Sequence, residues 1–186
     1  MGYCSSDAWI GDVGPESNDW GWAGFRGQRI VAATLAALAQ NFSMGTTPGR
    51  SDRLLFSGCS AGARGAMFTA DYVQAMVPRG MEVRAFLDSP LWVDEQPLLS
   101  DITSLENETQ AVYELVNATA RLGDACAAAY VPLGEGWKCL YGQYRLPYVE
   151  TLYLLSASQF DKYQLPYNEA RSLSLFLRIS AGTGRK

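Results

Sequence analysis

The residues with the clearest chemical potential form the stretch Gly58-Cys59-Ser60-Ala61-Gly62, which has the spacing G-x-S-x-G. In this motif the serine occupies a sharp, strained turn between a strand and a helix, and small neighbours let those two elements approach closely. The exposed hydroxyl of Ser60 can attack a carbonyl carbon, and the Ala61 amide at the helix start can donate to the oxyanion that forms. The alternative is a glycine-rich packing turn without chemistry.

Asp161 is the acidic residue best placed to act with Ser60. It follows a predicted strand at residues 151–157, and the carboxyl ends of parallel strands meet at one edge of a sheet. A carboxylate at that edge would orient a catalytic histidine. The alternative is that Asp161 caps a helix or is a solvated loop residue.

The chain contains no histidine at all. A serine hydroxyl is a weak nucleophile at its own pKa and needs a neighbouring base to take its proton. We therefore predict that these 186 residues by themselves have no useful esterase activity.

Apolar periodicity places the candidate residues on alternating strands and helices. Residues 1–27 are rich in Gly, Ser, Asp and Trp and predict an irregular surface segment, and residues 124–141 predict a loop flanked by cysteines. Gly65 is expected to let its helix lie against the sheet. The pattern predicts one α/β domain over residues 1–186, with a mostly parallel sheet covered by helices on both faces. The predicted helices are 28–40, 61–77 and about 108–122, and the predicted strands are 54–56, 81–87 and 151–157.

Composition excludes several classes of function. The net charge is -4 without a basic run, which argues against a nucleic-acid partner. No window approaches the roughly 20 apolar residues that span a bilayer, and the first residues lack the pattern of a signal peptide. The four cysteines lack the C-x-x-C spacing of zinc sites, so neither a metal nor a cofactor is expected. Spaced cysteines and glycosylation sequons at Asn41, Asn107 and Asn117 favour a secreted protein over a cytosolic one.

Six segments resemble, in the same order, motifs of the pectin acetylesterase and Notum family. The family is similar to the α/β hydrolases in fold, and its members are secreted serine carboxylesterases with a Ser, Asp, His triad and no cofactor. They remove acetyl groups from pectin or, in the animal Notum proteins, a palmitoleoyl group from Wnt proteins. The segments are YCSSDAWIGD at 3–12, FRGQRI at 25–30, SGCSAG at 57–62, FLDSP at 86–90, WKCLYGQY at 137–144 and SQFDKYQL at 158–165.

The resemblance implies roles for particular residues. Ser60 matches the family nucleophile, Asp161 matches the triad acid, and Cys126 and Cys139 match a disulfide pair of the Notum branch. The family has a Gly-Gly-Trp segment before the first motif and its histidine after the triad acid. The resemblance therefore implies the central part of a longer esterase, with a sheet incomplete at both ends.

Departures from the family pattern keep other functions open. Ala63, Pro90 and Thr69 stand where the family usually has Gly, Gly and Asn, which suggests a distant member. The first alternative is an inactive relative that binds carbohydrate or lipid, and the second is an unrelated serine hydrolase.

Several side chains near the motifs have no assigned role in the sequence. Cys59 is expected to be a packed free thiol, and Cys4 has no assigned partner. The aromatic residues near the candidate site would line an acyl or sugar pocket or belong to the core, and we expect core for at least half of them. They are Trp9, Trp92, Phe160 and Tyr163.

Overall fold

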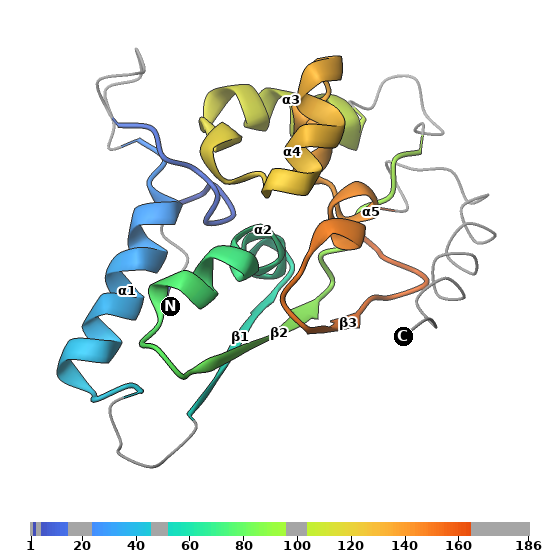
Figure 1. The fold of residues 1–186 in the computed structure, drawn as a ribbon. Coiled ribbons are helices and arrows are strands. Elements are labelled where there is room, and N and C mark those ends of the chain that lie inside the picture. The colour runs from blue at the N-terminus through green and yellow to red at the C-terminus, as the bar shows by residue number, and fades with distance from the viewer. Residues whose placement is uncertain (1, 3–4, 15–23, 46–51, 96–103, 165–186) are drawn as a thin grey trace.

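A parallel three-stranded sheet forms the base of the fold in the computed structural model (Figure 1), which describes residues 2, 5–14, 24–45, 52–95 and 104–164. The strands are β1 (Arg53–Cys59), β2 (Glu82–Asp88) and β3 (Tyr153–Ser156), in the order β1-β2-β3. Cys59 pairs with Asp88, and Asp88 pairs with Ser156. The three strands therefore end level with one another at one edge of the sheet.

Two long helices pack on one face of this sheet. These are α1 (Gly27–Asn41) and α2 (Ala61–Met76). Alternate strand residues such as Val83, Ala85 and Leu87 are buried against them, because successive side chains of a strand point to opposite faces. The predicted α/β class with a parallel sheet is confirmed.

The opposite face of the sheet is open in the part of the chain that the structure describes. Leu55 of β1 is 65% exposed and Leu154 of β3 is 66% exposed. We predicted helices on both faces of the sheet. In the described part of the chain, helices cover one of the two faces. The predicted buried strand at 54–56 is wrong in its burial, because every second residue of β1 is exposed.

Short helices form a further layer over α2 (Figure 1). The predicted helix at 108–122 is instead α3 (Leu105–Leu115). It ends shortly before Asn117, whose backbone has a left-handed conformation. The predicted loop at 124–141 is helical, and a disulfide joins Cys126 to Cys139 with their Cα atoms 6.0 Å apart. The remaining short helices are η2 (Ala118–Arg121), α4 (Asp124–Tyr130), η3 (Val131–Leu133), η4 (Gly136–Leu140), α5 (Gly142–Arg145) and η5 (Leu146–Tyr148).

The described part of the first 27 residues is irregular but largely buried, so the expectation of a surface segment is wrong. The carboxylate of Asp7 is itself buried and accepts hydrogen bonds from the backbone N–H groups of Trp9, Gly11 and Gly27 at 2.8 to 3.0 Å. These bonds satisfy backbone donors that have lost contact with water. The segment packs on α2, where a Cβ atom at Gly65 would lie 2.2 Å from the carbonyl oxygen of Ala8. Gly65 therefore makes room for this segment and not, as expected, for the sheet.

Candidate active site

Ser60 lies on the turn between β1 and α2 with backbone angles of φ 53° and ψ -120°. A positive φ is costly for a residue with a side chain and persists only where the surroundings impose it. Here the Ser60 N–H donates to the carbonyl oxygen of Asp88 at 2.9 Å, which ties the turn to the end of β2. The side chain is exposed at the carboxyl edge of the sheet.

The close approach expected at this turn involves Gly58 most directly. A Cβ atom at position 58 would lie 2.2 Å from the carbonyl carbon and oxygen of Gly62, whereas one at position 62 would meet nothing within 4 Å. Ala61 begins α2, and the first N–H groups of a helix have no acceptor within the helix. The amide of Ala61 thus lies beside the Ser60 hydroxyl at the positive end of a helix of 16 residues.

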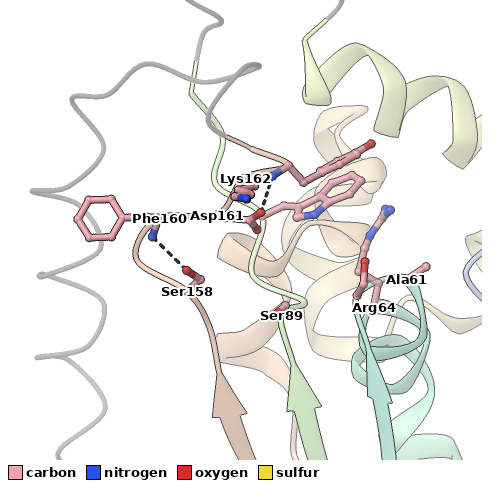
Figure 2. Close-up of a pocket in the computed structure, with 10 residues that line it drawn as sticks. Ala61, Arg64, Ser89, Ser158, Phe160, Asp161 and Lys162 are labelled. Carbon is pink, nitrogen blue, oxygen red and sulfur yellow. Dashed lines mark hydrogen bonds between the residues drawn. The ribbon is translucent and has the colours of Figure 1, made fainter.

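Ser60 and Asp161 line the same open pocket, which has a volume of about 600 Å³. Figure 2 shows this pocket with Asp161 and Ala61 among its labelled lining residues. Asp161 follows β3 and reaches the pocket from the same sheet edge as Ser60. The structure therefore brings these two residues together, as expected, while their catalytic roles stay predictions. The full lining consists of Ser60, Ala61, Arg64, Ser89, Trp92, Ser158, Phe160, Asp161, Lys162 and Tyr163.

Hydrogen bonds hold both carboxylate oxygens of Asp161. Its Oδ1 accepts from the Tyr163 N–H at 2.8 Å, and its Oδ2 accepts from the Gln164 side-chain amide at 2.8 Å. This arrangement gives the carboxylate a defined orientation at the pocket wall.

Three of the four aromatic residues singled out in the sequence line the pocket, and the fourth, Trp9, belongs to the core. The Trp92 ring is stacked with Tyr163 at a centroid distance of 5.7 Å, and the Arg64 guanidinium lies 3.6 Å from the Trp92 centroid. Trp92 is also partly buried against the core cluster of Leu105, Trp137 and Tyr141, whereas Phe160 and Tyr163 are exposed. Trp9 and, in part, Trp92 therefore belong to the core, in line with our expectation for half of the four.

Several pocket residues were missed in the sequence. Arg64 lies one helical turn after Ser60, so its spacing on the predicted helix was the available signal. Ser89, Ser158 and Lys162 follow predicted strands at the same edge. Gln164 lies within the family motif SQFDKYQL at 158–165, but the motif gave it no role of its own.

Cys59 is exposed, so the expectation of a packed thiol is wrong. The thiol forms a hydrogen bond with the Asp88 carboxylate, and that contact, the negative charge of Asp88 and partial desolvation raise the pKa of Cys59 above its usual value. Cys59 is therefore protonated at neutral pH and is a poor competitor to Ser60 as a nucleophile. Cys4 lies outside the described residues.

Other expectations concern the surface and possible ligands. The sequon residues Asn41, Asn107 and Asn117 are all exposed. No cluster of three or more potential metal ligands occurs among the described residues. Within the same ranges, no helix has the length and apolar character needed to cross a membrane.

Comparison with known proteins agrees with the motif order. A model of the family described as Pectinacetylesterase matches residues 1–174. The chain belongs to the pectinacetylesterase family. The resemblance seen in the six sequence motifs is thereby confirmed.

Relatives in this family include named esterases from animals and plants. The chain is 27% identical over 172 residues to palmitoleoyl-protein carboxylesterase NOTUM of Drosophila melanogaster, and the match covers 88% of the chain and 24% of that protein. It is 25% identical over 166 residues to pectin acetylesterase 7 of Arabidopsis thaliana, with 88% and 39% covered. The matched region thus spans well under half the length of these pectinacetylesterase-family relatives.

The fold is shared with a solved structure of the Wnt deacylase Notum from Drosophila. The TM-score is 0.80 at 24% sequence identity, and the match covers 97% of this chain and 55% of the Notum chain. At this identity the comparison shows the shared fold alone.

Proposed function

We propose that this chain carries the nucleophile and the acid of a serine carboxylesterase. The observation that supports this most is that Ser60, on a strained turn, shares one pocket with Asp161 although the two lie after different strands. Membership in a family with a named protein carboxylesterase and a named pectin acetylesterase supports the same class of reaction.

In the proposed reaction the Ser60 Oγ attacks the carbonyl carbon of an ester while a base takes the hydroxyl proton. The carbonyl oxygen becomes an oxyanion, which the Ala61 amide and the positive end of α2 stabilise. The bond to the alcohol then breaks, and the base returns the proton to the departing alkoxide. Water, deprotonated by the same base, releases the acid from acylated Ser60 and restores the hydroxyl.

The usual base of such a reaction is an imidazole, and the chain contains no histidine. We propose that an imidazole comes from polypeptide outside these 186 residues and that Asp161 accepts its N–H. On this proposal the chain is part of a longer enzyme, and the exposed sequons with the disulfide support secretion of that enzyme.

The pocket lining favours a short acyl group on an anionic alcohol. Arg64 and Lys162 bring two cations to the pocket against the single carboxylate of Asp161, and Ser89 and Ser158 add hydroxyl groups. A long acyl chain requires an extended apolar wall, whereas the apolar part of this lining consists of three aromatic side chains and Ala61. Acetyl esters of a polysaccharide that bears carboxylates, such as pectin, fit this composition.

The experiment supplies the missing base as free imidazole. We expect the chain to hydrolyse 4-methylumbelliferyl acetate faster than its Ser60→Ala variant when imidazole is present and at the same rate when it is absent. Asp161→Asn should lower the imidazole-dependent rate, because the added imidazole would lose its acceptor. Equal rates for the chain and Ser60→Ala in imidazole would contradict Ser60 as the nucleophile.

An inactive binding module is the second candidate, and the absence of histidine favours it. Titration with acetylated and deacetylated oligogalacturonates separates the two. Binding of both sugars with no Ser60-dependent release of acetate in imidazole would favour the binding module over the esterase.

A further inference from the structure

We infer that Gln164 is a positioning residue that holds the Asp161 carboxylate in its orientation at the pocket. The effect of Gln164 on catalysis rests on the proposed function. Its effect on the orientation of the Asp161 carboxylate can be tested without measuring any reaction. Gln164 is 5% exposed and comes shortly after Asp161 at the end of the described chain. Burial of a polar amide is costly unless each of its groups has a partner.

The side-chain amide of Gln164 has a partner for each of its groups. Its Nε2 donates to Asp161 Oδ2 and to the carbonyl oxygen of Leu91, both at 2.8 Å, and its Oε1 accepts from the Val93 N–H at 3.0 Å. The amide therefore links the loop after β3 to the segment after β2. An amide so held cannot rotate without breaking at least two of these bonds.

The bond from Gln164 also decides which way the Asp161 carboxylate turns. The Tyr163 N–H holds Oδ1 from within the same loop, and this bond alone leaves Oδ2 free to swing. Gln164 anchors Oδ2 to the Leu91–Val93 segment, which continues from β2. Because a small displacement of a catalytic group lowers rates strongly, such an anchor matters for an acid that orients a base.

Ring stacking also connects the loop after β3 to the segment after β2. Tyr163 is stacked on Trp92, so the residue before Gln164 packs on the segment that Gln164 binds. The hydrogen bonds of Gln164 add a direction that stacking does not impose, since they end on the carboxylate itself.

The test compares Gln164→Met and Gln164→Glu with the control Gln143→Met. Gln143 of α5 binds the same segment, because its amide oxygen accepts from the Asp94 N–H at 2.8 Å. Arg64 and Lys162, the charged groups that share the pocket with Asp161, are unchanged in all three variants. The first readouts are the amide NMR signals of Tyr163 and Val93 and the carboxyl signal of Asp161.

We expect Gln164→Met to shift the Tyr163 amide and Asp161 carboxyl signals, while Gln143→Met leaves both unchanged. In Gln164→Glu, two carboxyl groups within hydrogen-bond distance would share one proton at mildly acidic pH and repel each other once both are ionised. The new carboxyl group at position 164, when protonated, would donate to Asp161 and accept from Val93, while its single O–H leaves the Leu91 carbonyl without this donor. Lowering the pH from about 8 to about 5 should therefore return the Tyr163 and Asp161 signals of this variant toward their wild-type positions. Gln164→Met should show no such recovery, and a purely packing role would not produce this pH profile.

The catalytic consequence is measured with imidazole present. Gln164→Met should lower the Ser60-dependent rate by up to about 100-fold, and Gln164→Glu should recover part of it at the lower pH. Unchanged Tyr163 and Asp161 signals in Gln164→Met, or the same signals for Gln164→Glu at both pH values, would overturn the inference. If the chain itself shows no Ser60-dependent rate, the proposed function fails, whereas the NMR result still decides the role of Gln164.

Discussion

At position 58 the backbone leaves no room for a side chain. The hypothetical Cβ atom would overlap the Gly62 peptide group, and backbone atoms cannot move aside as the end of a flexible side chain can. The serine turn thus depends on one glycine for space, while the second glycine of the motif has no such neighbour.

The two glycines should therefore respond differently to the same change. We expect Gly58→Ala to lower the free energy of unfolding by about 2 to 3 kcal/mol through overpacking and to abolish the imidazole-dependent rate. Gly62→Ala should change stability by about 1 kcal/mol or less, because alanine is favoured in helices and nothing lies within 4 Å. Urea unfolding of both variants measures this, and equal losses would contradict the contact at position 58.

A buried ion pair joins α2 to α5. The Arg145 guanidinium is fully buried and donates to Asp71 Oδ2 at 2.8 Å. The other oxygen of Asp71 accepts from the N–H groups of Glu150 and Thr151 at 3.0 and 2.8 Å. The carboxylate of Asp71 thus both neutralises a buried cation and fixes the entry to β3.

Removal of Asp71 should therefore be severe. We expect Asp71→Ala to lower the free energy of unfolding by about 3 to 5 kcal/mol, because Arg145 would remain as an unpaired buried charge. The control is Asp12→Ala, which breaks the exposed pair with Arg29 and should cost less than about 1 kcal/mol. Similar unfolding midpoints for the two variants would show that burial of Arg145 is not decisive.

At the scale of elements, a disulfide that closes a short loop stabilises the helical layer over α2. Cys126 of α4 and Cys139 of η4 are 13 residues apart and both are fully buried in one core cluster. Helices as short as these are marginal alone, so their order depends on tertiary packing and on the disulfide.

Reduction should loosen this layer and leave the sheet unaffected. Opening a loop of this length removes about 3 kcal/mol of stabilisation by the chain-entropy estimate. We expect thermal unfolding to begin at a lower temperature when a reductant is present. The variant with both Cys126→Ala and Cys139→Ala should unfold at the same lowered temperature without any reductant. Cys59→Ser is the control and should respond to reductant as the unchanged chain does, since the Cys59 thiol is free. If reductant still lowered the unfolding temperature of the double variant, the Cys126–Cys139 disulfide could not be its target.

At the scale of the whole molecule, the described part is a sheet with helices on one side. Leu55 and Leu154 lie on the open face, as their register with β2 shows, and Leu87 lies on the covered one. Exposed apolar side chains grouped on one sheet face promote association.

Charged residues on the two faces should therefore have opposite effects. We expect the variant with both Leu55→Lys and Leu154→Lys to stay folded, to lose no more than about 1 kcal/mol of stability and to associate less in sedimentation experiments. Leu87→Lys should prevent folding, because it buries a charge with no partner. Loss of folding in the first variant would show that the open face is covered in solution.

The sequence by itself determined the serine turn, the alternation of strands and helices and the family, because each can be recognised from short runs of consecutive residues. G-x-S-x-G and the apolar runs around it act within a few residues, and six motifs in order identify one family. Asp161 was predicted at the right edge because parallel strands end together, a rule that requires only the order of the elements.

Only the tertiary structure decided which side chains meet at the pocket and which faces are buried. The contacts of Gln164 with Leu91 and Val93 join residues more than 70 positions apart, and the burial of Asp7 depends on a segment that packs on α2. The exposure of Cys59 and Leu55 likewise depends on which face of the sheet the helices cover. Such contacts follow from how the elements pack, and local patterns in the sequence carry no information about packing between distant segments.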